Sequence, residues 1–67
     1  MKHVDVPQAE AGNYSADLYD PFGRRIRHVD FDGKSVQVSM EHVPPGIYTI
    51  IISGQQQKLY FEKILKL

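Results

Sequence analysis

Residues 43–54 read VPPGIYTIIISG, a proline-glycine turn followed by the most apolar run of the chain and a second turn signal. Pro44 and Pro45 lack a backbone N–H, so no β-ladder continues through them. Pro45-Gly46 suits the centre of a type II turn, because glycine readily adopts the positive φ of the third position. Residues 47–52 are all β-branched or aromatic and favour a strand. Since this run is apolar on both faces, we expect it to be central in a sheet or covered on its second face.

Shorter alternating segments flank this run and are separated by turn signals. We expect strands at residues 3–6, 14–19, 24–29 and 35–40, with turns at residues 20–23 and 30–33. The first of these turns, DPFG, fits type I, with aspartate first, proline second and glycine fourth. In the second of these strands, Tyr14, Ala16 and Leu18 should face one side, and the alternate side chains, from Ser15 to Tyr19, should face the other.

The last segment, residues 58–67, fits two patterns. Phe61, Ile64 and Leu65 have helical spacing, whereas alternate apolar residues through the same stretch have strand spacing. Turn signals recur about every ten residues along the chain and no other segment is helical, which favours a strand. A bulge near Glu62-Lys63 would reconcile the two patterns.

The sum of these segments predicts an all-β fold. About six to seven short strands joined by tight turns indicate a small immunoglobulin-like antiparallel β-sandwich. The 67 residues make a single domain, residues 1–67. A chain of this length buries a modest share of its surface, so its stability is marginal.

Composition argues against several functional classes. Lysine and arginine total 8, as do aspartate and glutamate, so the basic excess of nucleic-acid binders is missing and no nucleic-acid partner is expected. There is no cysteine, hence no disulfide and no thiolate nucleophile. No apolar run is long enough for a transmembrane helix. Because no nucleophile with a matching base can be assigned, we expect a protein that is not an enzyme and needs no cofactor.

The metal-binding candidates have simpler structural explanations. The three histidines share no metal-ligand spacing, so we expect surface histidines and no metal site; they are His3, His28 and His42. Asp30 and Asp32 are followed by a glycine, as in calcium loops, but the further ligands of an EF-hand are missing. A plain turn accounts for them.

A basic cluster and a set of tyrosines are each open to two interpretations. The cluster consists of Arg24, Arg25 and Arg27. It can form cross-strand ion pairs with Asp17 and Asp20, or it can contact an anion such as lipopolysaccharide. Three tyrosines could pack in the core and across strands, or they could form a strip that binds sugar; they are Tyr19, Tyr48 and Tyr60.

Three motifs, in this order along the chain, resemble a known family. Residues 14–24 read YSADLYDPFGR, a strand followed by a Tyr-Asp-x-x-Gly-Arg turn. Residues 40–48 read MEHVPPGIY and contain Pro-x-Gly-x-Tyr, and residues 63–66 read KILK near the chain end. Together they resemble the C-terminal sorting domain of type IX secretion in the Bacteroidetes, type A class, over residues 14–67.

The resemblance implies recognition rather than catalysis. Such a domain is the C-terminal domain of a larger secreted protein, and its expected partners are the N-terminal cargo domain, the outer-membrane secretion translocon and a sortase. The translocon passes the cargo from the periplasm through the outer membrane to the cell surface. There the sortase removes the domain and attaches the cargo to lipopolysaccharide.

The same resemblance assigns translocon and sortase recognition to six motif residues, which are Gly23, Arg24, Gly46, Tyr48, Lys63 and Lys66. The two glycines would act through backbone geometry. The two lysines and the last strand would make direct contact, because an exposed terminal strand can be read by strand addition.

Two other functions stay open at this point. The domain could be an immunoglobulin-like accessory, spacer or dimerisation module of a secreted surface enzyme, with a homodimer formed through an open edge strand. It could also be a small carbohydrate-binding module that uses the tyrosines.

Overall fold

The computed structural model contains six strands and describes residues 2–6, 12–54 and 57–67, with the backbone alone at residues 57–59. The strands are β1 (Lys2–Asp5), β2 (Tyr14–Tyr19), β3 (Arg25–Phe31), β4 (Ser35–Val38), β5 (Gly46–Gly54) and β6 (Gln57–Lys66). The described residues form no helix, and so none that could cross a membrane.

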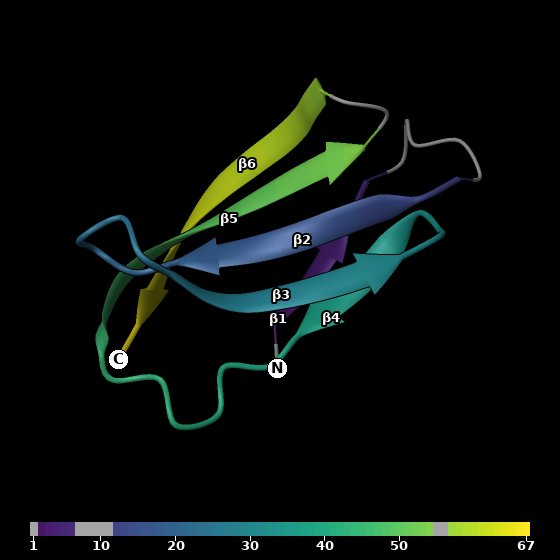
Figure 1. Cartoon of the computed structure of the whole chain (residues 1–67). Helices are drawn as coiled ribbons and strands as arrows, with labels where there is room; N and C mark the ends of the chain where they lie inside the picture. The colour runs from purple at the N-terminus through teal and green to yellow at the C-terminus, as the bar shows by residue number, and fades with distance from the viewer. Residues whose placement is uncertain (1, 7–11, 55–56) are drawn as a thin grey trace.

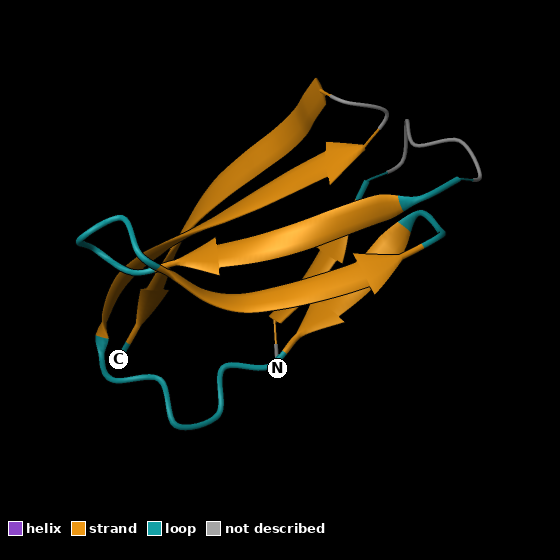
Figure 2. Ribbon diagram, viewed as in Figure 1, coloured by secondary structure: helices purple, strands orange, loops and turns teal. Residues whose placement is uncertain are grey.

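The strands form two antiparallel sheets (Figure 1). One has four strands in the order β3-β2-β5-β6, and the other pairs β1 with β4. The small sheet lies against one face of the large one (Figure 2), which we call the inner face; the opposite face is the outer face. Two packed antiparallel sheets are the immunoglobulin-like arrangement, so the predicted all-β sandwich is confirmed.

Strand β5 is an interior strand of the large sheet, as its apolar run predicted. It pairs with β2 on one side and with β6 on the other. Tyr48, Ile50 and Ile52 point to the inner face and are 3%, 0% and 0% exposed. The alternate side chains of β5 lie on the outer face, where Ile47 is exposed.

The core lies between the two sheets. The large sheet contributes the three inner residues of β5 together with Tyr14, Ala16 and Leu18, which confirms that these three side chains share one face and shows that it is the buried face. The small sheet and its flanks contribute Val4, Val6, Val36, Val38 and Val43. Because burial of apolar surface is the main favourable term in folding, these residues fix how the sheets stack.

The turn before β5 differs from the prediction. The main-chain N–H of Val43 donates to the oxygen of Met40 at 3.2 Å, and His42 has a positive φ of 63°. A type II turn therefore lies at residues 40–43 rather than at Pro45-Gly46. At Pro45-Gly46 the φ of Gly46 is 156°, whereas a type II turn needs a φ of about +80° there, and the oxygen of Pro44 accepts the hydroxyl of Tyr48.

Strand β3 runs further than predicted. Asp30 and Phe31, expected in a turn, are its last two residues. Phe31 pairs in register with Tyr14, and their ring centroids lie 5.7 Å apart. This cross-strand aromatic contact extends the ladder and moves the turn to the residues after Phe31. Strand β4, in contrast, ends at Val38, because the chain then enters the turn that contains Met40.

The last segment is a strand, as context predicted. The predicted bulge near Glu62-Lys63 is wrong, because both residues pair in register with Ile50 and Thr49. The register shift of this ladder lies instead between the Ile52–Tyr60 pair and the Ser53–Lys58 pair, so that the extra residue is Leu59 of β6. One extra residue there is enough to change the alternation that made the sequence ambiguous.

Candidate functional site

The three motif segments, far apart in the sequence, meet at one end of the sandwich. Figure 1 shows the β2–β3 turn, the start of β5 and the end of β6 together at the left of the molecule, close to the C-terminus. We call this region the motif end; it comprises residues 20–24, 40–48 and 63–67.

Asp20 organises the first segment. Its main-chain oxygen accepts the N–H of Gly23 at 3.0 Å, which confirms the predicted turn. Its carboxylate Oδ1 accepts the N–H groups of Phe22 and Arg24, each at 2.9 Å, and Oδ2 accepts Arg24 Nε at 2.9 Å. The hydrogen bond from the main-chain N–H of Arg24 to the carboxylate is the largest cause of the lowered pKa of Asp20. Gly23 has a φ of 84°, which a residue with a Cβ rarely adopts.

This turn presents a cation and an aromatic ring to solvent. The Arg24 side chain is 76% exposed and Phe22 is 84% exposed. The guanidinium carbon of Arg24 lies 5.7 Å from the centroid of the Phe22 ring, within the range of a cation–π contact. Since Asp20 holds the other side of the guanidinium, the pair is oriented rather than free to rotate.

The second segment packs beside the first. Tyr48 is buried, and its hydroxyl donates to the main-chain oxygen of Pro44. Gly46 opens β5 with a φ of 156°. A pocket of about 300 Å³ lies between the two segments, lined by Asp20, Pro21, Phe22, Arg24, Ile26, Pro44, Pro45 and Tyr48. The Gly-Arg turn and the Pro-x-Gly-x-Tyr segment thus form one surface.

The two lysines of the third segment lie in different environments. Lys66 is half-buried, and its ammonium group donates to the main-chain oxygen of Met40 at 2.8 Å and to that of Val43. Lys63 is exposed on the outer face, opposite Thr49 in register. Lys66 therefore holds the turn before β5, whereas Lys63 is accessible to a partner.

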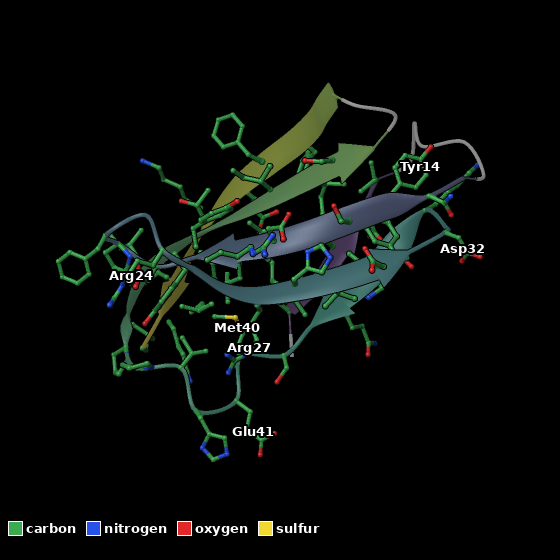
Figure 3. All side chains as sticks on the ribbon, viewed as in Figure 1. Tyr14, Arg24, Arg27, Asp32, Met40 and Glu41 are labelled. Carbon is green, nitrogen blue, oxygen red and sulfur yellow. The ribbon has the colours of Figure 1, made fainter. Side chains whose placement is uncertain are left out.

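Arg27 has a similar structural role, which the sequence did not reveal. Its Nη2 donates to the main-chain oxygen of Glu41 at 2.7 Å, and Figure 3 shows its side chain directed from β3 toward the turn that carries Met40 and Glu41. Arg25 instead contacts Asp17, with 3.4 Å between Nη1 and Oδ1. The predicted ion pairs of the basic cluster therefore form through Arg24 and Arg25, and not through Arg27.

The three tyrosines do not form one strip. Tyr48 lies on the inner face of β5, and Tyr60, opposite Ile52, faces the same way. Tyr19, in contrast, alternates with the buried Leu18 and borders an outer-face groove. The Tyr60 hydroxyl donates to Glu62 Oε1 at 2.6 Å, which raises the pKa of Tyr60. A flat sugar-binding platform would need the rings on one face, and the fold divides them.

The histidines lie apart and pair with carboxylates. His28 Nδ1 lies 2.6 Å from Asp17 Oδ1, and its Nε2 lies 3.1 Å from Asp30 Oδ1. The hydrogen bond with Asp17 is the largest cause that raises the pKa of His28. His3 contacts Asp5 at 2.8 Å. Within the described ranges no group of three or more histidine or acidic side chains is arranged to hold a metal ion.

The comparison with protein families agrees with the family that the three motifs resemble. The family model described as the secretion system C-terminal sorting domain matches residues 2–66. This match covers more of the chain than the motifs alone, because it includes the first strand. No curated protein and no solved structure matches the chain significantly. The chain belongs to the family of C-terminal sorting domains of type IX secretion, which operates in the Bacteroidetes.

Proposed function

We propose that this chain is the C-terminal domain of a larger secreted protein and directs that protein through the outer membrane to the cell surface. In this proposal residues 1–67 form one non-catalytic domain, recognised by the type IX translocon and then removed by a sortase. Membership of the sorting-domain family supports this role. The cargo is the part of the parent protein that precedes the domain.

The observation that carries the proposal is the convergence of the motifs at one end of the fold. Lys66 from β6 bonds to the turn before β5, and the pocket joins that segment to the Gly-Arg turn. A single recognition surface requires that its parts lie close together, and the three motif segments do so.

We assign the six motif residues to two roles. Four of them set the shape of the motif end: Gly23, Gly46, Tyr48 and Lys66, through positive φ values and internal hydrogen bonds. Arg24 and Lys63 are exposed and are the residues that we expect to contact the machinery. This division modifies the expectation that both lysines make direct contact.

The edge of β6 offers a second mode of contact. Within the described residues β6 pairs with β5 alone, so the other edge of this ten-residue strand has no partner strand. An extended segment of a partner can add to such an edge, with main-chain hydrogen bonds supplying affinity.

The test is a secretion assay. A periplasm-directed reporter is fused ahead of residues 1–67 and expressed in a Bacteroidetes host with an active type IX system. We expect the reporter at the cell surface or in the medium, and in the periplasm when residues 63–67 are deleted or when the translocon genes are absent. Normal surface display of the truncated fusion, or export without the translocon, would contradict the proposal.

A point variant separates recognition from folding. Arg24→Gln removes an exposed charge, and we expect reduced export with little loss of stability, because surface substitutions cost within about 0.5 kcal/mol. Lys34→Gln is the matched control, since Lys34 is exposed and lies outside the motif end. Equal export by the two variants would argue against a contact through Arg24.

A further inference from the structure

The outer face of the large sheet is open. The small sheet lies against the inner face only, and no described segment crosses the outer face (Figures 1 and 2). An antiparallel sheet with one open face normally carries polar side chains there. The β2–β3 half follows this rule, with His28 in hydrogen-bond contact with both Asp17 and Asp30.

The β5–β6 half does not follow it. Ile47 pairs in register with Leu65, and Ile51 pairs with Phe61. The exposed fractions of Ile47, Phe61 and Leu65 are 57%, 62% and 65%. Directly opposed side chains on one face lie about 5 Å apart, so each pair forms an apolar row across the two strands, and the Thr49–Lys63 pair lies between the two rows. We call Ile47, Ile51, Phe61 and Leu65, with Lys63 between them, the outer-face patch.

Lys63 lies in the middle row of this patch. It is opposite Thr49, between the Ile47–Leu65 row and the Ile51–Phe61 row. A groove of about 430 Å³ runs beside it, lined by Tyr19, Asp20, Pro21, Gly23, Ile47, Thr49, Ile51 and Lys63. The Asp20 carboxylate in this groove is already engaged by Arg24. Among the described residues no ion pair or hydrogen bond involves the Lys63 side chain, so its charge is not neutralised there.

This charge argues against a second copy as the occupant. A two-fold axis centred on Lys63, either through the patch or at the facing edge of β6, places this lysine beside its counterpart in the other copy. Like charges brought together in a desolvated contact oppose association. A partner that places a carboxylate beside Lys63 is instead attracted to it. Apolar side chains on either side of that carboxylate cover Phe61 and Leu65.

We propose that the outer-face patch docks an extended segment of a secretion-machinery protein whose side chains on one face run apolar, acidic, apolar. The segment adds to the free edge of β6, its acidic residue opposite Lys63 and its apolar residues opposite Phe61 and Leu65. The docking rests on the proposed sorting function and specifies the partner chemistry at the same site. Exposed apolar patches rimmed by charge are typical of protein interaction sites.

The test uses the reporter fusion with the full chain and three variants. Lys63→Glu reverses the central charge, Phe61→Ser combined with Leu65→Ser removes the apolar flanks, and Lys34→Glu makes the same charge change outside the patch. We expect the first two to lower export about tenfold, the effect of losing one good interface contact, and the Lys34→Glu control to export normally. The melting temperatures of the purified variants should match that of the wild type, because all of these side chains are exposed.

A suppressor screen identifies the partner's charge. Restored export of Lys63→Glu by an acidic-to-basic change in a translocon protein, without rescue of the apolar double variant, supports the docking. Normal export of Lys63→Glu, or suppressors confined to the chain itself, overturns it. A wild-type dimer that Phe61→Ser/Leu65→Ser dissociates in sedimentation also overturns it, because the patch then belongs to a second copy. If the wild-type fusion itself stays in the periplasm, the sorting function fails and the docking with it.

Discussion

The ammonium group of Lys66 lies 2.8 Å from the main-chain oxygen of Met40, a residue that precedes it by 26 positions. The same group donates to the oxygen of Val43. These two carbonyl groups begin and end the turn before β5. The last motif lysine therefore holds the end of β6 to the entry of the interior strand β5.

Replacing this lysine should destabilise the domain. Lys66→Met keeps the length of the side chain but leaves two carbonyl groups without their charged donor. Hydrogen bonds to charged groups contribute roughly 1.5–3 kcal/mol, so we expect a loss of that order in the free energy of unfolding. Urea denaturation measures it. Lys63→Met is the matched control and should change stability by less than about 0.5 kcal/mol; equal losses would refute the structural role of Lys66.

Gly54 should not accept a side chain, for reasons of space. A Cβ at this position would lie 2.2 Å from Cδ1 of Tyr14, a residue that is 5% exposed and whose ring contacts Phe31. Gly54→Ala forces that ring to move, and overpacking of a core typically costs about 1–3 kcal/mol. Thermal unfolding should show the loss. Gly33→Ala, where a Cβ meets nothing within 4 Å, should lack that steric cost.

The His28 network should make stability depend on pH. Contact with Asp17, and more weakly with Asp30, raises the pKa of His28 in the folded protein. The stability that protonated His28 adds to the folded protein is therefore complete below its unfolded-state pKa of about 6.5, and it is lost as the pH rises through the folded-state pKa. We expect the free energy of unfolding to fall across that window.

Asp17→Asn should flatten this pH dependence, because it removes the largest cause of the shift. Asp32→Asn removes a carboxylate outside the network and serves as the control. Unfolding curves at a series of pH values, together with an NMR titration of the His28 ring, provide the measurement. An unchanged slope in Asp17→Asn would show that another group is responsible.

The two faces of β5 should differ in their tolerance of truncation. Ile50 is 0% exposed on the inner face, and truncation of a buried isoleucine to alanine costs about 2–5 kcal/mol. Ile50→Ala should therefore lower the unfolding midpoint strongly and reduce export of the reporter. Ile51→Ala, on the half-buried outer face, should cost clearly less in stability. Comparable losses at the two positions would mean that the outer face is covered.

Local pattern determined most of the strands. Alternation placed Tyr14, Ala16 and Leu18 on one face, and the apolar run of residues 47–52 placed β5 inside its sheet, because side-chain period and backbone preference act within a few residues. The Asp-Pro-Phe-Gly turn was equally local, since every group in its hydrogen bonds lies within five residues. The order of the motifs also indicated the family, which the match over residues 2–66 confirms.

Tertiary structure decided what depends on distant partners. The turn lies at residues 40–43, where Lys66 donates to the carbonyl oxygens of Met40 and Val43 from 26 and 23 positions further along the chain. Tertiary structure also separated Lys66, held inside the motif end, from Lys63, exposed on the outer face. In the motif KILK the two lysines look equivalent. Because side chains alternate across a strand, Lys63 and Lys66 lie on opposite faces of β6, and only the packing of the two sheets determines which of these faces is covered.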